Sequence, residues 1–388
     1  MHKSLSQKWN QNPRWDGSFS WLNTSFLIAT PLLSIFAAIF LIYSKNFSWF
    51  DFNIFFGMSL ATGLSITAGY HRLFSHQSYK SSKLMELFYL LFGAAALQNS
   101  ALKWSSDHRY HHRFVDKEGD PYSIKNGFLY AHMGWIFYND PQDRGYDNAK
   151  DLQKNKLIQW QHRYFLIIAL AIGFILPTII GACFGRALEA FLWGGLFRTV
   201  FVHHGTFLIN SAAHVFGKKT YSDKNSARDC WWLAFFTNGE GYHNFHHAFA
   251  NDYRNGVKWY HWDPSKWLIY TLQFFGMSSD LKRTPDWLLL KVQAEKKYQE
   301  LQKNLANKPT AFAESMDKKI LELRNQLENQ LQVLAHLRQE YQTWKEQPSK
   351  KTIAPRTSDI YKQKRQVKQS WNHYCVAIQN GSRGRLPA

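Results

Sequence analysis

Cysteine is scarce in this sequence, and its scarcity excludes two kinds of protein. The 388 residues include only Cys183, Cys230 and Cys375, which lie far apart in the chain. This spacing does not form the framework of a disulfide-rich secreted domain, and it fits a reducing compartment. It also supplies no cluster of thiolates for a zinc or iron–sulfur site. Any metal site in this chain therefore has to use other ligands.

Acidic residues are also few in comparison with basic ones. The chain has 28 Asp and Glu residues against 47 Lys and Arg residues, a formal net charge of +19. This excess favours attraction to anionic lipid headgroups, to an acidic protein partner or to an anionic substrate head. Nucleic acid is the competing interpretation. We expect no nucleic-acid partner, because long apolar segments commit the chain to a membrane.

Four apolar runs are long enough to cross the hydrocarbon core of a bilayer. They cover residues 26–43, 50–70, 164–182 and 188–209. The mean hydropathy of −0.40 is low for a membrane protein because a long charged C-terminal tail dilutes these runs. Residues 84–102 are apolar but interrupted by polar side chains. We expect them to form a helix under the membrane or partly within it, rather than a crossing.

The breaks between the runs determine the expected topology. The breaks at residues 44–46 and 183–186 are so short that each pair of spans forms a hairpin and returns to its starting side. That side holds both termini, the central segment and most of the Lys and Arg residues, so the positive-inside rule makes it the cytoplasm. With no obvious signal for retention in the endoplasmic reticulum, we expect a multi-pass protein of a bacterial inner membrane.

Histidines gather in four clusters that these apolar stretches separate. Two of the clusters place histidines at i, i+3 and i+4, which puts all three on one face of a helix. One such cluster can arise by chance on a polar helix face. Three clusters of two or three histidines in order, with a single further histidine between the second and the third, are hard to explain by chance. The nine clustered histidines are His71, His76, His108, His111, His112, His214, His243, His246 and His247.

Nine imidazoles are too many for one metal ion, since tetrahedral zinc needs only four ligands. They suit two ions, with positions left for water or oxygen. Imidazole is a good ligand for iron, copper, zinc and nickel. A nitrogen-rich pair of metal ions beside membrane spans points to iron and oxygen chemistry.

The histidine motifs HRLFSH (71–76), HRYHH (108–112), NSAAH (210–214) and GEGYHNFHH (239–247) resemble, in this order and at these separations, those of the membrane-bound fatty acid desaturases. The resemblance is strongest to the Δ9 acyl-CoA (stearoyl-CoA) desaturase branch. It covers residues 15–285 and extends to the neighbouring sequences TAGY (67–70) and GDP (119–121).

The resemblance implies a reaction and a ligand set. Two adjacent hydrogens are removed from a saturated acyl chain to give a cis double bond, while O2 is reduced to water with two external electrons. The resemblance assigns the nine histidines to two iron ions (Fe2+/Fe3+) as the catalytic centre, with Asn210 as a water-mediated partner of one iron. The acyl carrier is coenzyme A in this branch and a phospholipid in bacterial relatives. Asp107, Asp120, Glu240 and Asp252 are candidate acceptors for the second ring nitrogens of the ligands.

The electrons have to come from another protein. No cytochrome b5-like haem motif, ferredoxin-type cysteine set or Rossmann glycine fingerprint is apparent in the sequence. We therefore expect a separate donor, such as a ferredoxin or a cytochrome b5 with its reductase. The basic cytosolic face is suited to docking an acidic partner of this kind.

Two other functions compete with desaturation. A lipid or alkane hydroxylase uses similar histidine boxes and yields an alcohol in place of an alkene. A metal-binding membrane transporter or sensor predicts polar residues throughout the spans, whereas here the histidines gather at one end of them. His203 and His204, in the last apolar run, are either outer partners of the metal site or polar groups satisfied within the helical bundle.

The C-terminal part of the chain differs in character, and we predict domains at 1–289, 290–346 and 347–388. Apolar residues between Met316 and Trp344 follow 3/4 spacing. This pattern predicts a coiled coil, which allows self-association, or a single amphipathic helix lying on the enzyme or the membrane. Residues 347–388 are basic and low in apolar content, which predicts disorder.

The expected fold is thus an all-α integral membrane protein. Four transmembrane helices form two hairpins. A cytosolic helical cap holds the histidine-rich di-metal site, and a helical or coiled-coil extension follows.

Overall fold

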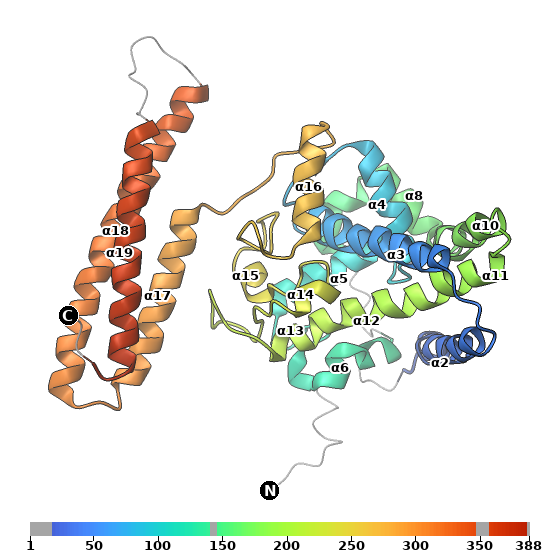
Figure 1. Ribbon diagram of the computed structural model, residues 1–388, viewed down its shortest axis with the longest axis horizontal. Coiled ribbons are helices and arrows are strands. Elements are labelled where there is room, and N and C mark those ends of the chain that lie inside the picture. Colours follow the sequence, from blue (N-terminus) through green and yellow to red (C-terminus); the bar gives the residue numbers. More distant parts are fainter. Residues whose placement is uncertain (1–17, 140–145, 347–356, 386–388) are drawn as a thin grey trace, which may run out of the picture. The chain divides into compact units, whose positions relative to one another are not determined.

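The computed structural model describes residues 18–139, 146–346 and 357–385, and it is almost entirely helical (Figure 1). The chain divides into two compact units, Met1–Arg283 and Thr284–Ala388. Each unit has a hydrophobic core of its own. The division falls a few residues before residue 289, where we predicted a domain boundary.

The first hairpin joins helix α2 (Trp21–Tyr43) to a longer helix, which begins as α3 (Trp49–Leu64) and ends as the π-helix η2 (Ser65–Ser75). Ser48 caps the start of α3, since its hydroxyl accepts a hydrogen bond from the Phe50 N–H at 3.2 Å. Pro31 lies inside α2 without ending it, as is common in membrane helices.

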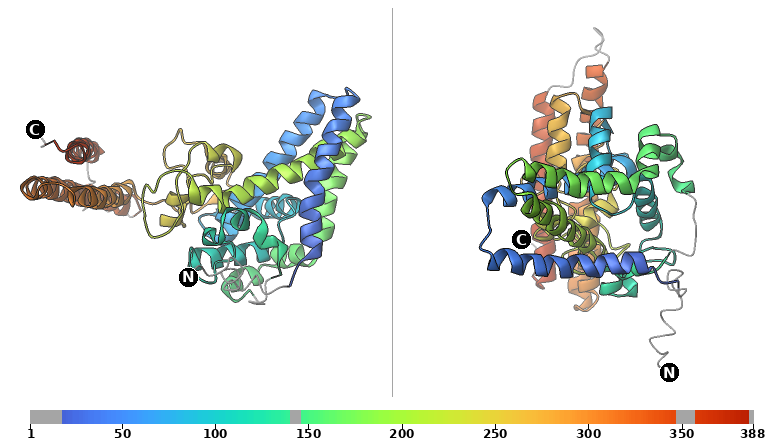
Figure 2. Two further views of the ribbon diagram at one scale, coloured as in Figure 1. Left: turned by 90° about the horizontal axis from the view of Figure 1, so that it is seen from below. Right: turned by 90° about the vertical axis from the view of Figure 1, so that its right-hand side faces the viewer.

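The second hairpin has the same design. Its first arm consists of α9 (Phe165–Leu170), η6 (Ala171–Ile175) and α10 (Leu176–Ala182), and its second arm of α11 (Ala187–Ala190), η7 (Phe191–Phe197) and α12 (Arg198–Asn210). At its turn, Arg186 forms an ion pair of 2.6 Å with Asp51, near the turn of the first hairpin. The two turns therefore lie at the same end of the helical bundle, where Figure 2 shows the blue and green helices side by side.

Three of the four predicted spans are long and apolar enough to cross a membrane. They are Trp21–Tyr43, Trp49–Ser75 and Phe165–Ala182. The fourth, 188–209, lies within continuous helix over residues 187–210 but is not among the three. Glu189, Arg198 and the paired histidines His203 and His204 lower its hydropathy. Arg198 is fully buried and donates to the backbone carbonyls of Ala95 and Gly173, so this helix packs among protein groups.

The central apolar segment, residues 84–102, is divided between two helices, where we predicted one, and it is not among the candidate spans of the described residues, in agreement with the prediction that it is not a crossing. Helix α4 (Lys83–Ala95) packs against η2, and α5 (Ala101–Phe114) follows after a sharp break. Leu97 and Asn99 have positive φ in that break, and the Ser100 hydroxyl accepts from the Lys103 N–H to start the new helix. Helix α5 carries the second histidine cluster.

Short elements complete the first unit around α5. Strand β1 (Lys80–Ser81) pairs antiparallel with β2 (Ser278–Ser279). The short helices are η3 (Ile124–Asn126), α6 (Phe128–His132), η4 (Gly134–Phe137), η5 (Asp147–Ala149), α7 (Lys150–Gln153), α8 (Lys156–Arg163), α13 (Ala212–Val215), α14 (Leu233–Phe236), α15 (His243–Ala248) and α16 (Pro264–Phe274).

The described residues of the second unit form a bundle of three helices, α17 (Asp286–Leu305), α18 (Thr310–Glu346) and α19 (Thr357–Ser382). The apolar residues with 3/4 spacing on α18 are buried against the other two helices, among them Met316, Ile320 and Leu327. The apolar face that we predicted for α18 is thus covered by α17 and α19 of the same chain. This removes the basis for expecting this face to form a self-associating coiled coil or to lie alone on a membrane.

The predicted disorder of residues 347–388 is wrong for Thr357–Ser382, which form α19. Val367, Tyr374 and Ile378 recur on one face of this helix and are buried, and the Tyr374 hydroxyl donates to the Ala294 carbonyl at 2.7 Å. The low apolar content of the segment concealed this periodic face. Residues 347–356 and 386–388, covered by the same prediction, lie outside the described residues.

Candidate metal centre

The first two histidines lie at the end of the π-helix η2. On an α-helix, residues five apart face roughly 140° away from each other, whereas a π-helix closes hydrogen bonds between i and i+5. The His76 N–H donates to the His71 carbonyl at 3.1 Å, and the two ring centroids lie 4.8 Å apart. The widened turn therefore brings the two histidines of HRLFSH close enough together to serve as a pair of ligands.

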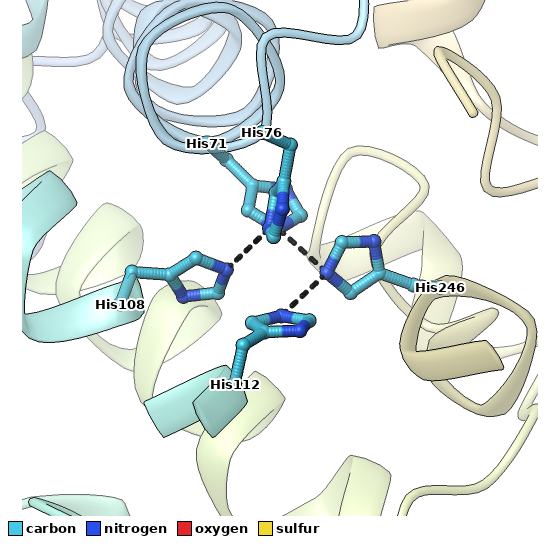
Figure 3. A group of neighbouring side chains, drawn as sticks. All are labelled: His71, His76, His108, His112 and His246. Atoms are coloured by element: carbon cyan, nitrogen blue, oxygen red, sulfur yellow. Dashed lines mark hydrogen bonds between the residues drawn. The ribbon is translucent and has the colours of Figure 1, made fainter. Parts of the chain in front are cut away.

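The nine clustered histidines form two groups, and in each group one ligand atom per residue lies within 4.8 Å of the others. The side chains of the first group point toward one another in Figure 3, and they are His71, His76, His108, His112 and His246. The second group consists of His111, His214, His243 and His247. All nine predicted histidines are thus brought together, although they come from segments up to 176 residues apart, since 247 − 71 = 176.

Helices α5 and α15 each contribute to both groups. On α5 the i, i+4 pair His108 and His112 enters the first group, and His111 enters the second. On α15 the i, i+4 pair His243 and His247 enters the second group, whereas His246 enters the first. His112 and His247 stack where the groups meet, with ring centroids 4.3 Å apart. The two candidate ion positions are therefore adjacent.

The imidazoles of the first group face one another through their Nε2 atoms. The separations are 3.0 Å for His71 and His246, 2.8 Å for His76 and His108, and 2.9 Å for His246 and His112 (Figure 3). Burial lowers the pKa of four histidines of this group well below the usual range, and the neighbouring rings lower it further. These four are His76, His108, His112 and His246. These four rings are therefore neutral at physiological pH, which is the state in which imidazole binds metal.

The second group has the same character, and two of its buried ring nitrogens, His214 Nε2 and His243 Nδ1, have no hydrogen-bond partner among the described residues. Burial lowers the pKa of His243 and His247 well below the usual range and that of His214 to about 3. The Nδ1 atom of His214 lies 2.7 Å from the Ser226 hydroxyl, which itself donates to Asp116. Its buried Nε2 atom has no hydrogen-bond partner among the described residues. Because an unpaired buried nitrogen is costly, this atom and the all-imidazole donor set fit a bound metal ion.

Two carboxylates orient ligands from outside the groups. Glu240 Oε2 lies 2.9 Å from His71 Nδ1, and Asp120 Oδ1 lies 2.8 Å from His111 Nδ1. The contact with Asp120 is a hydrogen bond that holds the proton of His111 on Nδ1, so that Nε2 presents its lone pair to the centre, and Glu240 lies at ion-pair distance from the same atom of His71. Both acids were among the four that we predicted for this role.

The other two predicted acids form ion pairs with neighbouring cations. Lys103 donates to the two carboxylate oxygens of Asp107 at 2.6 and 2.8 Å. Arg254 forms an ion pair of 2.8 Å with Asp252. The third observed orienting group, Ser226 with Asp116, was not apparent from the sequence, because a serine hydroxyl has no distinctive spacing.

Arg72 is a functional candidate that the sequence motifs did not identify. It is buried, and its guanidinium lies 2.8 Å from Glu240 and 2.9 Å from Asp263 while donating to the Tyr253 carbonyl. Glu240 therefore bridges Arg72 and His71. A charged residue in the last turns of a membrane span is itself a signal of function, and Arg72 lies within the first histidine motif, HRLFSH.

The two histidines of the last apolar run lie outside both groups. The His203 Nε2–H donates to the Ala96 carbonyl at 2.8 Å, so this ring is a polar group satisfied within the bundle. His204 Nδ1 lies 3.0 Å from His132 Nε2. His203 is therefore not an outer partner of the metal site, and our alternative interpretation, a polar group satisfied within the helical bundle, holds.

A cavity of about 750 Å³ opens onto both groups. His71, His108, His111 and His243 line it, together with Asn210, which we predicted as a water-mediated partner. Elsewhere its wall is mostly apolar and includes Leu22, Phe26, Leu27, Ile66, Phe165, Leu166, Leu170, Phe174 and Phe207. Gln98 donates to Thr206 at 2.9 Å, and both residues belong to the wall. The cavity can therefore hold a long apolar molecule beside the histidines.

Buried imidazole groups of this kind, at the ends of apolar helices, are consistent with the di-metal site of a helical membrane protein. The model of the fatty acid desaturase family matches residues 47–270. The chain belongs to this family, and it is an integral membrane protein with several apolar helices. The resemblance seen in the histidine motifs is thereby confirmed.

Individual relatives agree with the family. The chain is 41% identical over 282 residues to a probable acyl-CoA desaturase of Schizosaccharomyces pombe, covering 72% of this chain and 58% of the relative. It is 38% identical over 279 residues to acyl-CoA desaturase 1 of Saccharomyces cerevisiae, covering 71% and 54%. It is 35% identical over 265 residues to the sn-1 stearoyl-lipid 9-desaturase of Anabaena variabilis, covering 68% and 94%. The chain thus matches less than three fifths of the length of the two fungal proteins.

Proposed function

We propose that this protein is an O2-dependent fatty acyl desaturase of the Δ9 type. The observation that carries the proposal is the position of both histidine groups on the wall of one apolar cavity. Acyl-CoA is the proposed form of the substrate and a phospholipid-bound chain the alternative. The printed names of the fungal relatives support the first carrier, and that of the cyanobacterial relative supports the second.

The proposed cofactor is a pair of iron ions. The first group would hold one ion and the second group the other, with Asn210 as a water-mediated partner. When bound, the iron pair supplies the activation of O2 that removal of hydrogen from an unactivated methylene requires. The neutral nitrogen ligands keep the charge of the site high and leave positions open for O2.

The protein itself orients the ligands and the chain. Glu240 and Asp120 hold the tautomers of His71 and His111, and Arg72 keeps Glu240 ionised and in place. The apolar wall of the cavity excludes water from the acyl chain and aligns one pair of methylenes with the histidine groups. The depth of the cavity beyond that point determines the position of the double bond.

The balance of the reaction requires an electron donor. Two C–H bonds on adjacent carbons break, a C=C bond forms, and O2 takes up these hydrogens, two further electrons and two protons to give two water molecules. We propose a separate acidic protein, such as a ferredoxin or cytochrome b5, as the donor. The excess of basic residues, 47 against 28 acidic ones, supports a complementary docking face.

We also propose that four helices span the membrane, with the segment 187–210 as the fourth. The ion pair between Arg186 and Asp51 supports this arrangement, because it joins the turns of the two hairpins. The histidine groups then lie at the opposite, cytosolic ends of the helices.

The test is the product formed from labelled stearate in a host that expresses the protein, with a matched empty-vector host as the control. A labelled cis-9 monoene is the expected product. A double bond at another carbon would support desaturation but refute the Δ9 position. A hydroxylated product would favour the hydroxylase alternative. Purified protein with an electron donor and either stearoyl-CoA or stearoyl-phospholipid then identifies the carrier.

A further inference from the structure

The C-terminal unit contains a groove whose wall includes none of the nine histidines. It lies between α17, α18 and α19, and its volume is about 290 Å³. Its apolar wall consists of Trp287, Leu290, Leu334, Val367 and Trp371. Leu334 and Val367 are buried, whereas the two tryptophans and Leu290 are only partly buried. The bundle therefore leaves part of its aromatic core open at this place.

Basic side chains line the same groove. Arg338, Lys364 and Lys368 belong to its wall, against a single carboxylate, that of Asp286. Asp286 lies 3.6 Å from Arg338. Neither lysine lies within ion-pair distance of a carboxylate in the part of the chain that the structure describes. The groove thus combines an apolar wall with a net positive charge.

The basic residues belong to a wider pattern on α19. This helix carries Lys362, Lys364, Arg365 and Lys368 against one acid, Asp359. Helix α18, by contrast, mixes both signs along its length. Because positive charge is concentrated beside the groove and not spread over the bundle, we expect a ligand that is anionic at one end.

The size of the groove limits the apolar end of the ligand. Ligand pockets in proteins are typically about 300–1,000 Å³, so this groove lies at the lower limit and suits one hydrocarbon chain better than two. Tryptophan contributes a large apolar surface and a polar N–H, a combination suited to the boundary between a chain and its headgroup. A charged carboxylate pairs well with lysine ammonium groups at such a boundary.

We propose that this groove binds a long-chain fatty acid, with its carboxylate at Lys364 and Lys368 and its chain between Trp287 and Trp371. The site lies in a different unit from the proposed desaturase centre and does not depend on the proposed reaction. It extends the protein's function from acting on acyl chains to binding a free fatty acid at a second place.

The test uses the full chain in nanodiscs of zwitterionic lipid. A palmitic acid that carries a photoreactive diazirine on its chain is added, crosslinked by light and located by mass spectrometry of the labelled peptides. We expect label in the segments around Trp287 and Trp371, and we expect the double variant Lys364→Glu with Lys368→Glu to reduce it at least fivefold. Label in the first unit is scored separately.

The matched control is the double variant Lys318→Glu with Lys319→Glu. Both of these lysines are exposed on α18 and are absent from the groove wall, and the change in charge is identical. Label that persists in this control and falls in the groove variant supports the proposal. Equal loss in both variants would refute it, because the effect would then be general electrostatic attraction.

Two further measurements can also overturn the proposal. The neutral analogue, hexadecanol with the same diazirine, should label the groove several-fold less than the acid, and equal labelling would show that the lysines play no part. Unlabelled oleate should compete with the probe. Stronger competition by lysophosphatidylglycerol would show that the groove selects a phosphate headgroup, and would refute its assignment to a fatty acid.

Discussion

The two units of this chain bury different kinds of side chain. In the first unit, Arg72, Glu240 and Asp263 are buried together as an ionic network beside the histidines. In the second, the core is mostly apolar, and ion pairs such as Arg324 with Glu295 lie near the surface. Burying charge is costly unless each charge is paired and hydrogen-bonded. The contrast teaches that the first unit keeps a costly ionic network beside the histidines that we propose as metal ligands, while the second depends on hydrophobic packing.

The largest effect should come from removing a histidine that joins the elements of the first unit. His246 faces both His71 and His112. Loss of a group that only hydrogen-bonds to a metal ligand lowers metal affinity or activity about 10–100-fold. Loss of a ligand itself should have a larger effect, so His246→Ala should lower product formation by more than about 100-fold. Bound iron, measured by elemental analysis, and labelled monoene are the two readouts. His336→Ala, at an exposed histidine of α18, is the control and should leave both unchanged. Full activity in His246→Ala would exclude it as a ligand.

A second prediction compares one arginine from each unit. Arg72→Gln leaves Glu240 and Asp263 buried without their cation, which should cost about 3–5 kcal/mol. Arg324→Gln removes a partly exposed pair and should cost at most about 1 kcal/mol. Thermal unfolding of the purified variants, followed separately for the two units, measures both changes. If the two variants lost equal stability, the contrast between the units would be wrong.

A third prediction separates the two histidine groups. Asp120→Asn removes the negative charge beside His111, a member of the second group, and leaves Glu240 in place beside His71 in the first. Iron affinity of the second group should fall about 10–100-fold, so the iron content should move toward one ion per chain at limiting iron. Asp359→Asn in α19 is the control. Equal loss of both ions would contradict separate orientation of the two groups.

The smallest effect should follow removal of the whole second unit. Because residues 284–388 form a separate compact unit with its own core, a chain that ends at residue 283 should keep its desaturase activity within about twofold. Membrane insertion of the truncated chain, checked by fractionation, is the control. Loss of product from a well-inserted truncated chain would show that the chemistry depends on the second unit.

Much of the first unit could be predicted from local patterns. Three apolar runs had the length of membrane helices, and the i, i+3, i+4 spacing indicated one helix face in each of two histidine clusters. Averages over composition were less reliable. The low apolar content of residues 347–388 concealed the periodic apolar face of α19, where we predicted disorder, and the segment 187–210, whose polar residues the sequence displays, is not among the three candidate spans.

The sequence by itself determined the nine histidines, their helical spacing and the family. Only the tertiary structure decided that α5 and α15 divide their histidines between two groups, that a π-turn joins His71 to His76, and that Glu240 connects His71 to Arg72. Periodicity describes one helix at a time and places residues on its faces. Which faces meet depends on packing between segments more than a hundred residues apart, and no local pattern contains that information.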